Sequence, residues 1–340
     1  MNERLTLEKI GELAGVSRAT VSRVVNHHPN VRAEVRERVL GVIEETGYQP
    51  HLIARSLASN RSGVIGLIIP RIAQSLFTDP YYPRLIQGVA QTCNANDVVM
   101  ALFMFHTENE EEKLYPILQR PGLVDGVIIA SAQKFDPLVG RLAANAMPFV
   151  VIGRPAHAPE VSFVDVDNVT GAYTAVSHLI QQGRRRIAII NGRQDMSAGI
   201  DRRQGYLQAL SEHDLIADES LMADGNFEEA GAYDAMLRLL PHQPDAVFAA
   251  SDAMALGALR ALRTAAIAVP GQIAIVGFDD LPTAAIASPP LTTIRQPILR
   301  FGALATETLL DIIENGAESP RHIILPTELI IRGTCGATIV

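Results

Sequence analysis

The sequence of 340 residues predicts a small all-α domain at the N-terminus, followed by a two-lobed α/β core. In the first 47 residues, apolar side chains recur at the three-to-four spacing of short one-sided helices. From Val64 onward, short apolar runs alternate with helix-length stretches, as buried parallel strands and their covering helices do. The charge also changes sign near residue 62. Residues 1–62 hold nine Lys and Arg against seven Asp and Glu (+2), and the remainder holds 20 against 30 (−10).

Composition narrows the class of protein. With 48% hydrophobic residues, the chain is long enough for two or three domains with substantial cores. No apolar run reaches the roughly 18 residues of a membrane span, and Glu3, Glu8 and Glu12 interrupt the apolar stretch that a signal peptide needs. We therefore expect a cytoplasmic protein. Cys93 and Cys335 are far apart and belong to no CxxC or Cys/His cluster, so we expect ordinary thiols, with no disulfide, metal or cofactor.

The first two helices are expected to meet in a tight turn. Thr6 can cap a helix beginning at Leu7, and Gly15 can end it with a positive φ. Ser17 can then cap a second helix, which turns Val21, Val24 and Val25 inward and leaves Arg18, Ala19, Ser22 and Arg23 outside. Helices joined so tightly cross steeply, which is the helix-turn-helix arrangement. A third helix is expected from about Ala33 to Thr46, with Gly47 as its stop.

The exposed residues of the second helix form a narrow surface suited to a DNA major groove. Arginine can donate two hydrogen bonds to guanine O6 and N7, and the small Ala19 allows close approach or contact with a thymine methyl group. The hydroxyl groups of Thr6, Ser17, Thr20 and Ser22 suit phosphate oxygens. The alternative is an ordinary helical bundle with a solvated basic face.

The segment TLEKIGELAGVSRATVSRVVN, followed by ETGYQPHLIARSLAS, resembles the headpiece of the lac repressor and galactose repressor family. The resemblance implies that Arg18, Ala19 and Arg23 contact bases. It also implies that Tyr48 to Ser59 becomes a hinge helix in the minor groove of operator DNA, with Ala54 and Leu57 at the matching positions and Leu57 as an apolar wedge. His51, Arg32 and Val35 depart from the family pattern, and Arg32 in place of a serine predicts a weaker start of the third helix.

The core is predicted from seven apolar runs. Four of them, VIGLIIP, VVMALFMF, VDGVIIA and PFVVIG, are separated by helix-length stretches such as Tyr82 to Asn94 and Glu108 to Gln119. The alternation resumes with RIAIING, AVFAAS and IAIVGFDD. Two α/β units of similar build predict two lobes with a cleft between them.

Residues from about Gly63 to Gly333 resemble the sugar-binding core of the same family, which is related to periplasmic binding proteins; the markers are SDAMALGALRAL, VGFDD and PPLTTIRQP. The expected organisation is a helix-turn-helix domain (1–47), a hinge helix or linker (48–62) and an effector-binding and dimerisation core (63–340). The resemblance implies three crossings between lobes, near 164, 294 and 326. One lobe then spans about 63–164 and 295–325, and the other about 165–294 and 326–340.

Ligand chemistry is expected at strand ends facing the cleft, where a sugar needs polar groups for its hydroxyls and an aromatic ring for its apolar face. The resemblance implies that Arg202 binds hydroxyls, that Asp279 is the principal carboxylate, that Gln296 lies at a lobe crossing, and that Phe227 stacks on the ligand. It adds further effector-binding candidates, namely Ser251, Asp79, Tyr81, Tyr82 and Arg154. Alternatively, Arg202 and Asp279 form a purely structural ion pair, and Tyr81 and Tyr82 only roof their lobe. Asp252 is expected to cap a helix rather than to bind ligand.

The leading hypothesis is a homodimeric, allosteric transcriptional repressor that binds a pseudo-palindromic operator, with a small carbohydrate-like effector controlling its affinity. The first rival is the sugar-binding protein of a transport system, which would need a signal peptide and no DNA-binding surface. The second is an enzyme, but the sequence contains no GxSxG, GxxxxGK, HExxH or strand-linked GxGxxG motif. The chain ends without a leucine heptad, so we expect a dimer. A hexose, a disaccharide or a nucleoside-like ligand would all satisfy the pattern of candidate residues. The sequence is also compatible with an effector that releases the protein from DNA and with one that promotes DNA binding.

Overall fold

The computed structural model describes residues 5–25, 30–48, 61–70, 80–105, 107–130, 133, 137–145, 147–155 and 160–337. The chain divides into two compact units, Met1–Val64 with Arg120–Asp125, and Ile65–Gln119 with Gly126–Val340. Among the helices of these residues, none has both the length and the apolar character needed to span a membrane.

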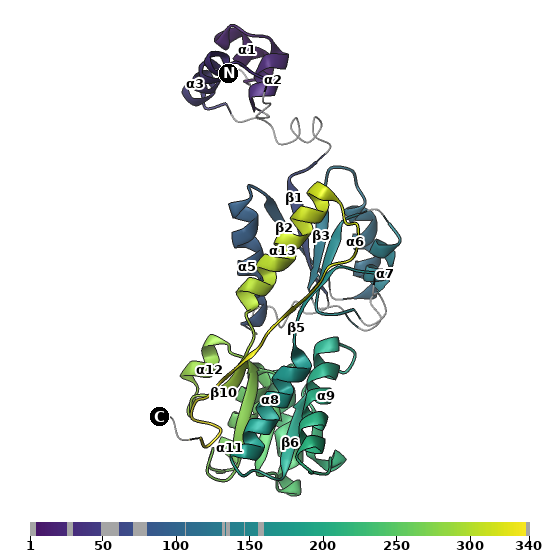
Figure 1. Ribbon diagram of the computed structural model, residues 1–340, viewed down its shortest axis with the longest axis vertical. Coiled ribbons are helices and arrows are strands. Elements are labelled where there is room, and N and C mark those ends of the chain that lie inside the picture. Colours follow the sequence, from purple (N-terminus) through teal and green to yellow (C-terminus); the bar gives the residue numbers. More distant parts are fainter. Residues whose placement is uncertain are drawn as a thin grey trace. The chain divides into compact units, whose positions relative to one another are not determined.

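The first unit contains the headpiece, formed by α1 (Leu7–Ala14), α2 (Arg18–Val25) and α3 (Ala33–Thr46) (Figure 1). Its core consists of apolar side chains from all three helices, including the fully buried Ile10, Val21 and Val39. Tyr48 belongs to this core and is only 6% exposed. The packed headpiece therefore extends one residue into the segment that we assigned to the hinge.

The described residues of the second unit form two six-stranded sheets. The sheet of the first lobe has the order β11-β5-β4-β3-β1-β2. Its strands are β1 (Val64–Pro70), β2 (Val99–Phe105), β3 (Gly126–Ala130), β4 (Phe149–Ile152), β5 (Phe163–Val166) and β11 (His322–Leu325). Its helices are α5 (Tyr81–Ala95), α6 (Glu108–Leu118), α7 (Pro137–Ala143) and α13 (Ile298–Asn315), of which α5 and α13 pack against each other (Figure 1).

The sheet of the second lobe has the order β12-β10-β9-β8-β6-β7. Its strands are β6 (Ile187–Asn191), β7 (Met222–Asp224), β8 (Ala246–Ala249), β9 (Ala274–Asp279), β10 (Thr292–Arg295) and β12 (Glu328–Ile330). Its α-helices are α8 (Asn168–Gln181), α9 (Ser197–Glu212), α10 (Glu229–Leu239), α11 (Asp252–Thr264) and α12 (Pro282–Ile286), and two 3₁₀ turns span Glu219–Leu221 and Leu240–His242. The β10–β12 pair is antiparallel, while β10, β9, β8, β6 and β7 pair in parallel.

Alternation along the strands explains why the central runs are apolar throughout. In β6, Ile187 and Ile189 pack on the side of α8 and α9, whereas Ala188 and Ile190 pack on the side of α10 and α11. Successive side chains of a strand point to opposite faces, so a strand with helices on both faces favours apolar side chains at nearly every position. The seven apolar runs in the sequence are β1, β2, β3, β4, β6, β8 and β9.

The chain crosses between the two sheets three times, after β5, after β10 and after β11. Consequently β11 completes the first sheet and β12 completes the second, although both lie near the C-terminus. In Figure 1 the two lobes lie end to end, with the crossing segments between them. The carboxyl ends of β4, β5, β6, β8 and β9 meet at the boundary between the lobes, where parallel α/β sheets place their ligand sites.

Candidate functional site

The headpiece presents the polar surface that the sequence predicts on α2. Lys9 N–H donates to the Thr6 hydroxyl over 3.3 Å, so Thr6 caps α1, and Gly15 ends that helix with a φ of 65°. Thr20 N–H donates to Ser17 Oγ over 3.2 Å, so Ser17 caps α2. These two caps and the glycine fix the turn between the helices.

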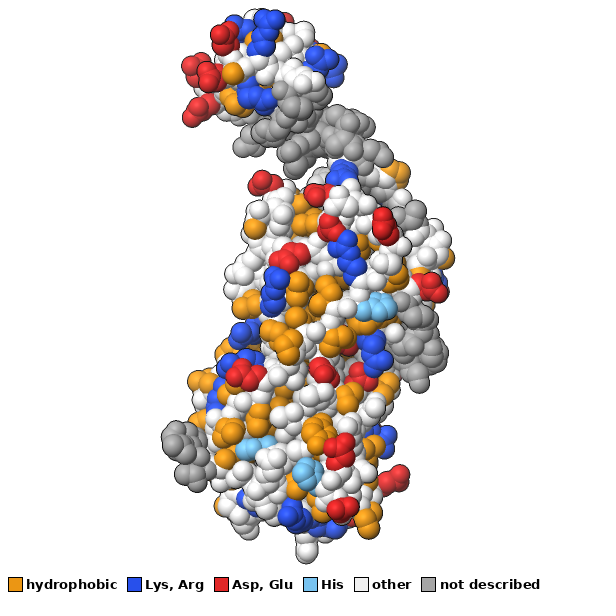
Figure 2. Space-filling view, viewed as in Figure 1, with side chains coloured by type: hydrophobic (Ala, Val, Ile, Leu, Met, Phe, Trp, Pro, Cys, Tyr) orange, Lys and Arg blue, Asp and Glu red, His pale blue; other side chains and the backbone are white. Residues whose placement is uncertain are grey.

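The side chains proposed to contact DNA fall into two groups. Ser17, Arg18, Ala19 and Arg23 are exposed, as is Thr6 at the start of α1, whereas Thr20 and Ser22 are half-buried. Arg18 Nε lies 3.0 Å from Glu8 Oε1, with the two side chains 68% and 57% exposed. An ion pair this exposed contributes little to stability, so Arg18 can exchange Glu8 for another acceptor at low cost. Figure 2 shows basic side chains on the headpiece surface.

Two other predictions about the DNA-binding segment have different outcomes. Arg32, the N-cap residue of α3, makes no side-chain capping hydrogen bond, so this helix has the weak start that was predicted. Ala54 and Leu57, the two residues proposed for the hinge helix, lie outside the described residues, and their roles stay predictions.

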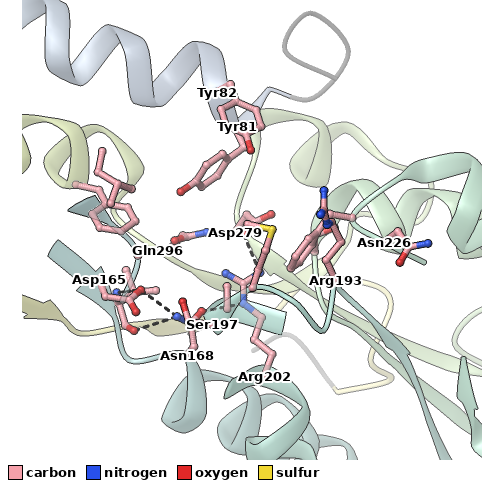
Figure 3. Close-up of a pocket in the computed structure, with 18 of the residues that line it drawn as sticks. Tyr81, Tyr82, Asp165, Asn168, Arg193, Ser197, Arg202, Asn226, Asp279 and Gln296 are labelled. Atoms are coloured by element: carbon pink, nitrogen blue, oxygen red, sulfur yellow. Dashed lines mark hydrogen bonds and ion pairs between the residues drawn. The ribbon is translucent and has the colours of Figure 1, made fainter. Parts of the chain in front are cut away.

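The second unit holds a cavity of about 310 Å³ between its lobes (Figure 3). Seven residues proposed for effector binding line it together, namely Tyr81, Tyr82, Arg202, Phe227, Ser251, Asp279 and Gln296. Of the other two candidates, Asp79 lies outside the described residues, and Arg154 is not among the lining residues. Apart from the neighbours Tyr81 and Tyr82, these residues are far apart in sequence, and they meet because the carboxyl ends of both sheets face the same space.

A buried polar cluster forms the centre of the cavity. Arg202 and Asp279 are 5% and 6% exposed, and Arg202 Nη1 lies 3.5 Å from Asp279 Oδ1. Gln296 Nε2 donates to the same carboxylate oxygen over 2.5 Å. The sequence analysis weighed a structural ion pair against ligand binding for Arg202 and Asp279. The pair forms, and both of its members also line the cavity.

Arg202 is held rigidly by several partners. Its Nε donates to Asn168 Oδ1 over 2.9 Å, and its Nη1 donates to the Ala250 carbonyl over 2.6 Å. Its guanidinium carbon lies 3.7 Å from the ring centroid of Phe278. Burial lowers the pKa of Arg202, and the charge of Asp279 opposes this shift. The guanidinium is therefore fixed in place before any ligand arrives, which reduces the entropy lost on binding.

Aromatic side chains line other walls of the cavity. Tyr81 and Tyr82 make an edge-to-face contact with their ring centroids 5.2 Å apart, and Figure 3 shows them on the opposite side of Asp279 from Arg202. The Phe227 ring lies against the backbone of Gly192, where an added Cβ would collide with it. Phe227 has a φ of 63°, a left-handed conformation that is uncommon for a large residue and is typical of functional sites.

Ser251, and not Asp252, is the N-cap residue of α11. Ser251 Oγ accepts a hydrogen bond from Met254 N–H, so Ser251 caps α11 while also lining the cavity. The prediction that Asp252 caps this helix is wrong. Asp252 is the fully buried first residue of α11, and its carboxylate accepts hydrogen bonds from Thr293 Oγ1 over 2.6 Å and from Leu281 N–H over 2.7 Å. Burial raises its pKa, and the nearby charge of Asp279 adds to the shift.

Several lining residues were not identified from the sequence. The polar ones are Asp165, Asn168, Arg193, Ser197, Asn226 and Glu228. Burial raises the pKa of Asp165 to about 6, although Val166 N–H and Arg154 N–H donate to its carboxylate. Arg193 and Ser197 follow β6, whose end the sequence marks, whereas the other four lie in or after β5 and β7, which the sequence analysis did not predict.

Arg154 takes part in a different contact. Its Nη2 lies 2.7 Å from both carboxylate oxygens of Asp201, a residue of α9 in the second lobe. Arg154 itself follows β4 of the first lobe. The ion pair therefore connects the lobes, and the guanidinium points to Asp201.

The described residues offer little to a metal ion. Among them, no group of three or more His, Cys, Asp or Glu side chains is placed to hold one. Cys93 and Cys335 are both free and buried.

The fold and the two sites together define a regulator with a DNA-binding headpiece and a ligand-binding core. Residues 6–51 match the model of bacterial regulatory proteins of the lacI family, and residues 176–335 match a periplasmic binding protein-like domain. The chain is 40% identical over 333 residues to the HTH-type transcriptional regulator CelR of Thermobifida fusca. This alignment covers 97% of the present chain and 98% of CelR. The chain is 37% identical over 338 residues to the regulator AglR of Rhizobium meliloti, covering 98% and 94%.

Two solved structures extend the comparison. A complex of CelR with cellobiose aligns with a TM-score of 0.78 and 38% identity, covering 97% of this chain and 100% of the other. A lac repressor dimer bound to operator and an anti-inducer aligns with a TM-score of 0.85 and 26% identity, covering 98% and 100%. The chain belongs to the lacI family of bacterial regulatory proteins and is a DNA-binding transcriptional regulator.

Proposed function

We propose that the protein is a homodimeric repressor in the cytoplasm, and that a neutral, sugar-like effector in the interlobe cavity controls its affinity for a pseudo-palindromic operator. The observation that carries this proposal is the cavity itself, which combines a carboxylate, a guanidinium, a primary amide and aromatic rings where the carboxyl ends of parallel strands from both sheets meet. Such a set supplies donors and acceptors for hydroxyl groups and an apolar surface for a sugar ring.

The charges around the cavity favour a neutral ligand. Among the residues that the structure describes, five charged side chains line it, three acidic (Asp165, Glu228 and Asp279) and two basic (Arg193 and Arg202). Both arginines already face carboxylates, since Arg202 lies beside Asp279 and Arg193 Nη2 lies 2.5 Å from Asp195 Oδ2. A phosphate or carboxylate ligand would need donors that are not neutralised in this way. A glycoside with many hydroxyl groups fits better, and cellobiose is the first probe because the similar CelR was solved with it.

Dimerisation supports sequence selectivity. One recognition helix contacts only a few base pairs, so two headpieces related by a two-fold axis are needed for an inverted repeat with half-sites about one helical turn apart. The similar lac repressor was solved as a dimer on its operator. Within each headpiece we propose Arg18, Ala19 and Arg23 for base contacts, and Thr6, Ser17, Thr20 and Ser22 for phosphates.

The test is a linked binding experiment. Inverted-repeat duplexes selected from a random pool are titrated with the full-length protein, alone and with each member of a panel of hexoses, disaccharides and nucleosides. We expect a preference for one inverted repeat and a shift of its Kd by one neutral sugar. Thermal shifts with and without DNA then show whether sugar and operator oppose or reinforce each other. The proposal fails if no duplex is preferred over random DNA under any of these conditions.

Two alternatives are tested by the same material. We propose that the bound sugar is not converted, so chromatography after prolonged incubation should recover it intact, and any product would favour an enzyme. A transport role is tested by fractionation, since detection of the chain in the periplasm would contradict a regulator that works on DNA.

A further inference from the structure

The contact between Arg154 and Asp201 joins the two lobes beside the cavity without lining it. Arg154 comes from the loop after β4, and Asp201 lies on α9, which also supplies Ser197 and Arg202 to the cavity. The Arg154 side chain is 48% exposed and that of Asp201 only 9%. Opening the lobes would separate the pair and leave Asp201 without the guanidinium on which both of its oxygens depend.

The same pair belongs to a closed ring of polar contacts. Arg154 N–H donates to Asp165 Oδ2 over 3.1 Å, and Asn168 Nδ2 donates to Asp165 Oδ1 over 3.1 Å. Arg202 Nε donates to Asn168 Oδ1 over 2.9 Å, and Arg202 directly follows Asp201 on α9. The ring therefore connects the interlobe ion pair to the guanidinium at the centre of the cavity.

A second contact between the lobes touches the same helix. Met196, the N-cap residue of α9, forms an isolated antiparallel β-bridge with Gln133, which follows β3 of the first lobe. The start of α9 is thus held against the first lobe twice, by a backbone bridge and by the ion pair of Asp201.

We propose that Arg154 and Asp201 form an interlobe latch that sets the equilibrium between the closed and open lobes and thereby the affinity for the effector. The identity of the effector in this proposal rests on the proposed function, whereas the action of the latch on the lobes is independent of it. A ligand that contacts both lobes binds the closed state, and its apparent Kd rises as the closed fraction falls. Arg154 is therefore a positioning residue, in contrast to the direct ligand contact that the family resemblance implies.

The experiment compares Arg154→Gln, Asp201→Asn and the double variant with the wild type. Spin labels at Lys113→Cys on α6 and Ser211→Cys on α9, both exposed positions in different lobes, report the interlobe distance in the ligand-free protein. Calorimetry with cellobiose, or with the sugar that the panel identifies, gives Kd. The matched control is Arg186→Gln, which removes an Arg–Asp pair of 3.3 Å that lies entirely within the second lobe.

We expect each single variant to shift and broaden the interlobe distances and to raise the effector Kd about 5-fold by lowering the closed fraction. The double variant should add little, because either substitution alone already breaks the latch. Arg186→Gln should leave both measurements unchanged. Arg154→Lys, which keeps a cationic donor, should recover part of the affinity and guards against a folding defect of the glutamine variant.

Three results would overturn the latch. Unchanged interlobe distances in Arg154→Gln would show that the pair does not hold the lobes. A weaker Kd for Arg154→Gln with a normal one for Asp201→Asn would make Arg154 a direct ligand. Additive effects in the double variant would show that the two residues act separately. If no sugar binds even the wild type, the proposed effector is wrong, while the distance measurement still decides on the latch.

Discussion

Asp279→Asn is the substitution that tests the cavity most directly, because it removes one charge while keeping the size of the side chain. Asp279 Oδ1 lies 3.5 Å from Arg202 Nη1 and 2.5 Å from Gln296 Nε2, and all three side chains are buried. The variant thus leaves the Arg202 charge with less compensation and replaces a strong acceptor for ligand hydroxyls by a weaker one.

The size of the effect follows from these contacts. A hydrogen bond to a charged group contributes roughly 1.5–3 kcal/mol, so the effector Kd should rise about 10- to 150-fold. Breaking a buried ion pair can cost about 3–5 kcal/mol of folding stability, and we expect the lower end or less. Arg202 keeps its bonds to Ala250 and Asn168, and removing the Asp279 charge relieves its repulsion of Asp252.

The assay pairs calorimetry on the effector with fluorescence anisotropy on the operator. Asp279→Asn should bind operator in the absence of sugar as the wild type does and should lose the response to sugar. The control is Asp218→Asn, which removes a carboxylate on the surface of the same lobe that pairs with Arg186 outside the cavity. An effector Kd within threefold of the wild type would remove Asp279 from the site and refute the geometric argument.

Four other predictions concern single features of the structure. Arg18→Ala should relax preference at particular base pairs, measured by binding to a panel of single-substitution operators. Glu8→Gln should strengthen operator binding two- to fivefold in ~0.1 M salt, since it frees Arg18 and removes a negative charge near the phosphates. Gly192→Ala should displace the Phe227 ring and raise the effector Kd about 10-fold by calorimetry. Since the pKa of Asp165 is raised to about 6, its contribution to stability is present at acid pH and is lost as the pH rises through 6. The free energy of unfolding of the wild type, measured in urea relative to that of Asp165→Asn, should therefore fall by up to about 3 kcal/mol between pH 4 and 7.

Each of these has a result that would contradict it. Equal weakening of every operator by Arg18→Ala would make it a phosphate contact, and unchanged binding in Glu8→Gln would mean that the pair does not compete with DNA. Gly140→Ala, where nothing lies within 4 Å of the added Cβ, is the control for Gly192→Ala, and equal Kd values in the two would dismiss the role of the Phe227 ring. A stability difference that does not vary with pH would refute the assigned pKa.

The elements that could be predicted are those with a local signal in the sequence. Capping residues and glycines mark the ends of the headpiece helices, and continuous apolar runs mark the central strands, which are buried on both faces. In contrast, the sequence analysis did not predict β5 (FVDV), β7 (MAD), β10 (TTIR), β11 (HIIL) or β12 (ELI). These strands are short and lie at the crossings or at sheet edges. Their polar residues contact residues from distant parts of the chain, so they break the apolar pattern.

The site shows the same division. Arg202 and Asp279 stand in motifs that mark them, whereas Asp165 and Asn168 enter through contacts that only the tertiary structure creates. Ser251 and Asp252 show how precisely a cap would have to be placed from the sequence. Only one position separates the residue that caps α11 from the buried residue that follows it. The interlobe role of Arg154 depends on the angle between lobes, and no local pattern encodes that angle.

The fixed position of Arg202 bears on how a ligand could switch this protein. A ligand shifts an equilibrium only by the difference between its affinities for the two states. Because Arg202 is already held by Asn168, Ala250 and Phe278, contacts with it alone gain little from closure. The contacts that do depend on closure are those from the opposite lobe, among them Tyr81 and Tyr82. We therefore compare variants that lose the same amount of effector affinity. Substitutions at the tyrosines should weaken the coupling between sugar and operator more than substitutions around Arg202, and double titrations of sugar and operator would measure that difference.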